Sequence, residues 1–400
     1  MTSRPRVSLL VLRVTHSVCR TAPTIKTPFR PRYMVRSKLV TTLVSAAVVV
    51  PSAVEGQAVG DLSALLEQTR LQAGIPALVA TVASSDSVLA EGVAGVRDVG
   101  SDEVATLDDL WHIGSVTKSF TSTLASRLAA EGEFSWNLTL GEVFPAAAGT
   151  DFDTVPASAL AQHTAGFPRN PPRWWLGSAR TLELPYDEQR REVVSEALEA
   201  GPEYEPGTEM LYSNLGYMAL GSALESRVGE PWQQLLRERV LTPLGLSSAG
   251  FGAPGSLDIV DQPRGHRRNA EGELVSFPGL DNPAALGPAG TLHMSIRDLS
   301  RYAQEHLEGE LGVDGLLSSE EFRRLHRGGL GDYAYGWVDA TDPSGRRMIW
   351  HNGSNTAWYA FVGLIPDADR IIVIVANAGD AREPVHELLD TLIERWAPAG

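Results

Sequence analysis

The chain has 400 residues, of which 43% are hydrophobic and 21% are charged. This composition is typical of globular proteins, and it excludes the disordered and fibrous classes. The net charge of −15 gives the chain as a whole no basic surface for nucleic acid.

The first 58 residues differ from the rest in charge. They hold nine Lys or Arg residues and one acid, Glu55, whereas residues 59–400 hold 25 basic and 48 acidic residues, a net charge of −23. A basic segment before an acidic body is typical of a removable leader. We therefore expect residues 1–58 to be a leader and residues 59–400 to be the functional domain.

Residues 34–58 have the pattern of a signal peptide. Arg36 and Lys38 precede an apolar run that is too short for an ordinary membrane span. Gly56 and Ala58 are small residues at positions −3 and −1 of a cleavage site after Ala58. The pattern predicts a secreted or periplasmic protein with no stable membrane span after cleavage, and an uncleaved anchor is the alternative.

The only cysteine, Cys19, lies in the leader. After cleavage the chain would hold no disulfide, no thiol nucleophile and no thiolate metal site. Residues 1–33 lack the features of a signal peptide, so Met34 is an alternative start to Met1.

Hydrophobic periodicity predicts strands at both ends of the domain and helices between them. Strands are expected at 77–84, 87–96, 333–338, 347–350, 358–364 and 370–376. Helices are expected at 61–71, 115–131, 187–200, 214–228, 232–240, 295–307, 318–324 and 383–396. The predicted fold class is α+β: one antiparallel β-sheet built from both chain ends (59–110 and 330–400), flanked by helices, with a large, mostly helical inserted region (111–329).

The first segment that can carry chemistry is Gly114-Ser115-Val116-Thr117-Lys118. If Ser115 opens a helix, Ser115 and Lys118 share a face and point into the same space. The helix start also offers free backbone N–H groups and a positive dipole end, which favour an oxyanion. A helix cap beside a surface charge is the alternative, because this spacing of Ser and Lys often arises by chance.

The distribution of lysine sharpens this choice. The chain has three lysines, and Lys118 is the only one in residues 59–400. The other basic residues of the domain are arginine, which cannot lose its proton, whereas a buried lysine can. Since a base for Ser115 needs that ability, the composition favours a catalytic role for Lys118.

The second segment, Tyr212-Ser213-Asn214, precedes a predicted helix. A tyrosine near a cation can have a lowered pKa and relay protons, and Asn214 can hydrogen-bond a substrate. Alternatively, Asn214 only caps the helix and Tyr212 is a packed aromatic.

The third segment, His351-Asn352-Gly353-Ser354, follows a predicted strand. Gly353 lets a ligand approach the backbone closely. The Ser354 N–H is a candidate second oxyanion donor beside that of Ser115. A strand-end turn with a surface histidine is the alternative.

Together, in this order, the three segments resemble the serine β-lactamase and penicillin-binding protein family. The Tyr-x-Asn of the second segment is similar to that of class C β-lactamases and the related carboxypeptidases and esterases. The resemblance spans nearly all of 59–400 and includes Ile75-Pro76-Ala77, His163-Thr164-Ala165-Gly166 and Pro288-Ala289-Gly290. It implies Ser115 as nucleophile, Lys118 and Tyr212 as acid–base pair, Asn214 as the residue that orients substrate, and His351 and Gly353 as the third motif. It implies no metal or organic cofactor.

One departure from the family pattern bears on the substrate. Class C β-lactamases carry Lys-Thr-Gly where this chain has His351-Asn352-Gly353. An imidazole, which is mostly neutral at pH 7–8 and then donates one hydrogen bond, replaces a fixed ammonium. This motif resembles that of some D-alanyl-D-alanine carboxypeptidases, D-amino-acid peptidases and esterases. We therefore expect an ester or D-amino-acid peptide to be hydrolysed faster than a β-lactam, and a β-lactamase proper is the alternative.

Other classes are weighed by their motifs. No G-x-S-x-G elbow is present, and His386-Glu387 lacks the second histidine of a zinc peptidase. A non-catalytic penicillin-binding or sensor module on the same fold is a further alternative. The loop 171–175 is a candidate pocket wall or a hydrophobic plug over the core. The expected partner is a small-molecule or peptide substrate, and the sequence does not predict an oligomeric state.

Overall fold

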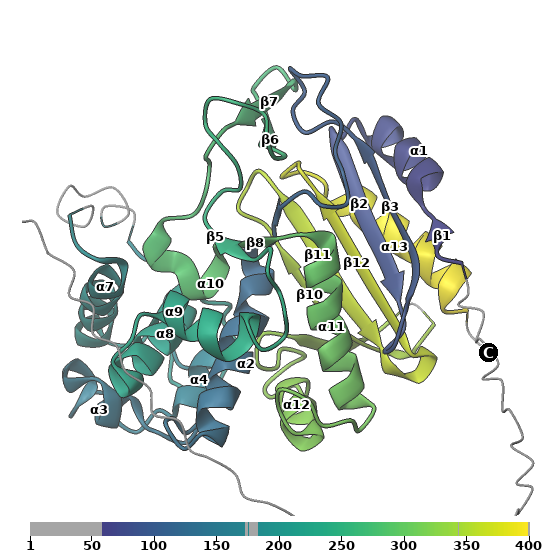
Figure 1. The fold of residues 1–400 in the computed structure, drawn as a ribbon. Helices are drawn as coiled ribbons and strands as arrows, with labels where there is room; N and C mark the ends of the chain where they lie inside the picture. Colours follow the sequence, from purple (N-terminus) through teal and green to yellow (C-terminus); the bar gives the residue numbers. More distant parts are fainter. Residues whose placement is uncertain (1–57, 173–174, 176–182, 343, 399–400) are drawn as a thin grey trace, which may run out of the picture. The chain divides into compact units, whose positions relative to one another are not determined.

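A seven-stranded sheet is built from segments near both ends of the domain, in the order β1-β3-β2-β12-β11-β10-β9 (Figure 1). The structure is a computed structural model that describes residues 58–172, 175, 183–342 and 344–398. Almost all of the predicted leader therefore lies outside the described residues. The strands are β1 (Gly60–Asp61), β2 (Ala77–Ala83), β3 (Val88–Gly95), β9 (Val338–Thr341), β10 (Arg347–Gly353), β11 (Tyr359–Ile365) and β12 (Arg370–Ala376).

Antiparallel pairing of β2 with β12 joins the two ends of the domain, with Val79 opposite Val375. Within the described strands of this sheet, the short β1 pairs in parallel with β3, and the other neighbours pair antiparallel. Because successive strand residues point to opposite faces, each face of the sheet packs against different helices. Alternate residues of β2 face α1 (Ser63–Ala73) and α13 (Arg382–Trp396), and the others face α11 (Ile296–Glu310) and α2 (Thr117–Ala130).

In the sequence, the mostly helical region lies between the first strands of the sheet, β1 to β3, and the last, β9 to β12, as predicted. Besides α2 and α11, the described part of this region holds further helices. They are α3 (Leu140–Val143), α4 (Ala157–Ala161), α7 (Tyr186–Ala200), α8 (Asn214–Val228), α9 (Trp232–Leu236), α10 (Gly287–Gly290) and α12 (Ser319–Leu325). This arrangement confirms the predicted α+β class with an antiparallel sheet and flanking helices.

Two small sheets interrupt the helical region, and the sequence did not predict them. One has the order β4-β8-β5, and the other pairs β6 with β7. Their strands are β4 (Trp111–His112), β5 (Gly250–Phe251), β6 (Gly265–Arg268), β7 (Leu274–Phe277) and β8 (Leu292–Met294). Runs of two to four residues are too short for a period of two to be recognised.

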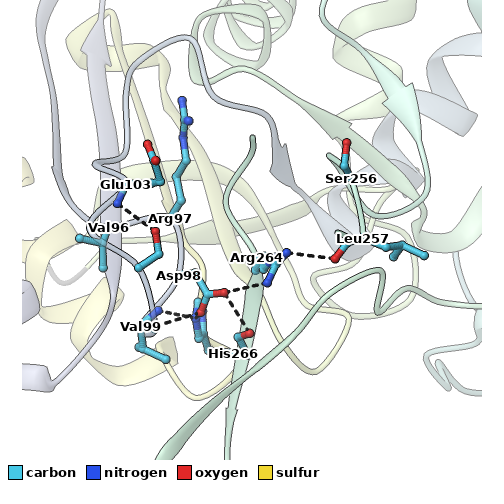
Figure 2. A network of polar contacts seen from close by, with 12 residues as sticks. Val96, Arg97, Asp98, Val99, Glu103, Ser256, Leu257, Arg264 and His266 are labelled. Atoms are coloured by element: carbon cyan, nitrogen blue, oxygen red, sulfur yellow. Dashed lines mark hydrogen bonds and ion pairs between the residues drawn. The ribbon is translucent and has the colours of Figure 1, made fainter. Parts of the chain in front are cut away.

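A polar network ties the loop after β3 to the β6–β7 hairpin (Figure 2). Asp98 accepts a hydrogen bond from Arg264, with Nη1 and Oδ2 3.0 Å apart. The Val99 N–H donates to Nε2 of His266, so the proton of the neutral ring lies on Nδ1, which is 2.8 Å from the Asn377 carbonyl oxygen. The hairpin is thereby fixed to the chain that follows β12.

Three predicted elements need correction. The strand expected at 333–338 is wrong, because Gly336 has a φ of +80° and the chain turns there before β9. The helix expected from Ser115 begins with a 3₁₀ turn, Gly114–Val116, before α2. The helix expected at 232–240 becomes a π-helical turn after Leu236. In the part of the chain that the structure describes, no helix is both long enough and apolar enough to cross a bilayer.

Candidate active site

Ser115 and Lys118 meet at the start of α2. Ser115 lies in the 3₁₀ turn that leads into the helix, and Lys118 lies in its first turn. Lys118 Nζ is 3.2 Å from Ser115 Oγ. The spacing of three residues therefore brings the two groups together, although Ser115 itself precedes the α-helix.

The Lys118 side chain is fully buried, and its hydrogen-bond partners among the described residues are neutral. Nζ lies 2.8 Å from Asn214 Oδ1 and 2.7 Å from the carbonyl oxygen of Ala289 in α10. Burial lowers the pKa of Lys118 well below its usual value, and the positive charge of Arg169 acts in the same direction. This environment favours the neutral amine.

The second motif lies at the start of α8. Ser213, not Asn214, caps the helix, because its Oγ accepts the Gly216 N–H at 2.8 Å. The Asn214 amide is thus available for Lys118, and its Nδ2 donates to Asn170 Oδ1 at 2.7 Å.

Tyr212 lies beside Lys118, whose Nζ is 4.8 Å from the centre of the phenol ring. Burial raises the pKa of Tyr212, and a hydrogen bond with Ser115 and the charge of Arg169 oppose that rise. The expectation of a lowered pKa is therefore wrong for Tyr212, because loss of solvation outweighs the nearby cation.

The third motif ends β10 and approaches the turn that holds Ser115. A Cβ atom at Gly353 would lie 1.9 Å from the Ile113 carbonyl oxygen and 2.7 Å from the Ser115 nitrogen. Likewise, a Cβ atom at Gly114 would lie 2.3 Å from the Ser354 nitrogen. Glycine at both positions lets the two backbones approach, and this brings the N–H groups of Ser115 and Ser354 into the same part of the site.

His351 is buried behind this contact, with 2% of its surface exposed. Nδ1 is 2.5 Å from the Asn352 carbonyl oxygen, so Nδ1 donates, and Nε2 accepts from the Tyr333 hydroxyl at 3.0 Å. Burial lowers the pKa of His351 to about 3, and Lys118 acts in the same direction. The imidazole is therefore neutral at pH 7, but both nitrogens are engaged within the protein, contrary to the expected free donor.

Sequence reasoning assigned no role to several residues around the site. Arg169 lies near the Tyr212 ring, and the carbonyl oxygen of Ala289 holds Lys118. The sequence patterns place Tyr333 in a predicted strand and His163 in a family-like segment. Their contacts join segments far apart in the chain, and a single sequence does not reveal such pairings.

The structure describes only part of the loop 171–175 that was proposed as a pocket wall. Arg173 and Trp174 lie outside the described residues. Trp175 is 2% exposed and belongs to the main hydrophobic core, which agrees with the plug alternative. Within the described ranges, no group of three His, Cys, Asp or Glu side chains is arranged to hold a metal ion.

Comparisons with known proteins identify a matching family and several relatives. The Beta-lactamase family model matches residues 60–393. Penicillin-binding protein 4 of Amycolatopsis lactamdurans is 26% identical over 334 residues, which are 78% of this chain and 84% of the relative. The D-alanyl-D-alanine-carboxypeptidase/endopeptidase AmpH of Escherichia coli K12 is 29% identical over 217 residues, and the match covers 53% of this chain and only 52% of that relative.

A solved structure shows the same fold. The beta-lactamase/D-alanine carboxypeptidase of Pseudomonas syringae superposes with a TM-score of 0.67. The superposition covers 83% of this chain and 98% of that one, at 22% sequence identity. At that identity the likeness concerns the fold alone.

Proposed function

The chain belongs to the beta-lactamase family, and on this premise we propose that it is a serine hydrolase that forms an acyl-enzyme on Ser115. The bond cleaved is an ester, a D-amino-acid peptide bond or a β-lactam amide. The observation that carries the proposal is the 3.2 Å contact between Ser115 Oγ and a buried Lys118 that has only neutral hydrogen-bond partners among the described residues.

The contacts of Lys118 support its role as the base. Two of its partners are carbonyl oxygens, which only accept hydrogen bonds, so a neutral amine directs its two N–H groups to Asn214 and Ala289. Its lone pair then faces the Ser115 hydroxyl, which donates. The lowered pKa of Lys118 favours this neutral state over the ammonium, relative to a solvated lysine.

Tyr212 is proposed as the acid. Because burial raises its pKa, the phenol keeps its proton at neutral pH. In the proposed reaction, Ser115 Oγ bonds to the carbonyl carbon while its proton passes to Lys118. The carbonyl oxygen becomes an oxyanion, to which the N–H groups of Ser115 and Ser354 donate. As the intermediate collapses, Tyr212 protonates the leaving group, and the Lys118 ammonium restores the tyrosine proton.

Hydrolysis of the acyl-enzyme completes the cycle. Lys118 takes a proton from water as the water oxygen bonds to the acyl carbon. The bond to Ser115 then breaks, the carboxylic acid leaves, and Ser115 Oγ regains a proton from Lys118. The reaction needs no redox partner and no second substrate except water.

The third motif supports a preference among substrates. A buried, neutral His351 supplies no fixed positive charge for a substrate carboxylate. We therefore propose that a neutral ester, or a D-amino-acid peptide that carries no carboxylate beside the scissile bond, is hydrolysed faster than a penicillin.

Two measurements test the proposal. The first is the mass of the protein after reaction with a fluorescent penicillin, which should increase by one acyl group in the wild type and not in Ser115→Ala. The second is kcat/KM for a short-chain ester, a D-Ala-D-Ala peptide and a penicillin. Labelling without turnover of any substrate would indicate a binding or sensor module, and fastest turnover of penicillin would indicate a β-lactamase proper.

Export is a separate proposal, supported by the basic and apolar pattern of residues 34–58. Cleavage after Ala58 gives a mature chain that begins at Val59. N-terminal sequencing of the protein from the culture fluid or periplasm tests this. A mature protein that still contains the apolar run of the leader would contradict it.

A further inference from the structure

His163 has an unusual backbone for a residue with a side chain. It follows α4, is 1% exposed, and has a φ of +60°. Only a few per cent of non-glycine residues adopt such an angle, and they persist where the surroundings fix them. The chain reverses here, because the Thr164 N–H bonds back to the Ala159 carbonyl oxygen at 2.9 Å.

The reversed backbone lets His163 hold both neighbours of Tyr212. Its carbonyl oxygen accepts the Leu211 N–H at 2.9 Å, and its ring Nδ1 accepts the Ser213 N–H at 3.1 Å. The Tyr204 hydroxyl donates to the same carbonyl oxygen at 2.9 Å. One residue therefore fixes the backbone immediately before and after Tyr212.

The imidazole also packs against the phenol itself. The ring centres of His163 and Tyr212 are 4.4 Å apart. The ring centres of His163 and Tyr333 are also 4.4 Å apart. The Tyr212 ring lies beside Lys118 and hydrogen-bonds with Ser115. Among the hydrogen bonds of the described residues, His163 contacts neither Lys118 Nζ nor Ser115 Oγ, so its link to the site runs through Tyr212.

Acceptance at Nδ1 fixes the tautomer of His163. A nitrogen that accepts the Ser213 N–H carries no proton, so the neutral ring is protonated at Nε2. Burial lowers the pKa of His163 well below its usual value, which keeps the ring neutral. Protonation of Nδ1 would place two donors against each other and open the contact with Ser213.

We propose that His163 is a positioning residue for the proposed hydrolysis, and that it orients the Tyr212 hydroxyl through its paired contacts with Leu211 and Ser213. This inference rests on the proposed function, because it explains how Tyr212, the proposed acid, is held in position. His163 acts through Tyr212 and is not itself a catalytic residue.

Two substitutions compare the site with and without a side-chain acceptor at position 163. In His163→Leu, the acceptor for the Ser213 N–H is lost. In His163→Asn, an oxygen on Cγ replaces Nδ1 as acceptor, and asparagine tolerates a positive φ. We expect His163→Leu to lower kcat for the best ester substrate by ~10- to 100-fold with little change in KM, and His163→Asn to restore most of that loss.

A Tyr212→Phe background distinguishes the two explanations. If His163 acts through the Tyr212 hydroxyl, His163→Leu should cause much less further loss in Tyr212→Phe than in the wild type. Equal losses in both backgrounds in folded protein would overturn the inference. Failure of the proposed hydrolase function would be recognised by a different result, namely a wild-type protein that shows neither substrate turnover nor labelling of Ser115.

The wild-type tautomer provides a test that does not depend on any variant. The ¹⁵N chemical shifts of the His163 ring should show an unprotonated Nδ1 and a protonated Nε2 at pH 7 in the full-length domain. A proton on Nδ1 would overturn the inference even if every His163 variant failed to fold.

Discussion

Two fully buried cations in the helical region have opposite surroundings. Arg190 of α7 forms a two-point ion pair with Glu225 of α8, and its Nη1 donates to the Ala285 carbonyl oxygen at 3.3 Å. Lys118 of α2 has an amide, a carbonyl and a hydroxyl as hydrogen-bond partners. The same helix, α8, supplies the carboxylate for one cation and the neutral Asn214 for the other.

The difference separates a structural cation from a reactive one. A buried arginine beside a carboxylate stays charged and joins two helices. A buried lysine without a carboxylate is destabilised in its charged form and can give up its proton. The arrangement around Lys118 therefore favours base catalysis, whereas that around Arg190 favours a fixed helix pair.

The largest effect is expected from removal of one half of the ion pair. Arg190→Met leaves the Glu225 carboxylate buried without its cation, so the free energy of unfolding should fall by about 3–5 kcal/mol. Urea denaturation measures this loss. The double variant Arg190→Met/Glu225→Gln should regain part of it, because glutamine still accepts the Trp232 N–H that now bonds to Glu225 at 2.8 Å.

Lys118→Met should cost less stability than Arg190→Met. It leaves no buried charge and only two neutral carbonyl oxygens without a donor, whereas Arg190→Met leaves a buried carboxylate and the Ala285 carbonyl oxygen without their donor. An equal loss of stability in the two variants would contradict the distinction between the two cations.

Lys118→Arg tests the distinction in activity. Arginine keeps the charge but cannot accept the Ser115 proton, so the acylation rate should fall ~100-fold or more. Rapid-mixing measurements with an ester report this rate, and circular dichroism checks the fold. A folded Lys118→Arg variant with near-normal acylation would exclude Lys118 as the base.

The pH dependence of acylation follows from the lowered pKa of Lys118. The active form is the neutral amine, so kcat/KM should rise about tenfold per pH unit below that pKa and level off well below pH 10.5. Between the lowered pKa and 10.5 the unfolded chain binds more protons than the folded chain, so stability should also rise with pH across that window. A rate that keeps rising to pH 10.5 would show an unperturbed lysine.

Several features of the fold and site could be predicted from residues alone. The helix at 214–228 and the strand at 370–376 match α8 and β12 at both ends, because each has a strong local pattern. Ser115 and Lys118 were found through spacing and the rarity of lysine. The contacts of Ala289, Tyr333 and His163 were missed, since each depends on tertiary packing between distant segments.

The smallest effect is expected when a second lysine enters the same neutral surroundings. In His351→Lys the new side chain would be buried near Lys118, and burial would favour its neutral form. It would therefore attract a carboxylate weakly, and the ratio of kcat/KM for penicillin to that for a neutral ester should rise by only ~1–2 kcal/mol, about 5- to 30-fold. His351→Gln, which adds no charge, is the matched control. A much larger rise in this ratio in His351→Lys than in His351→Gln would mean that a buried lysine stays charged at this position. The neutral surroundings would then not explain why Lys118 differs from Arg190.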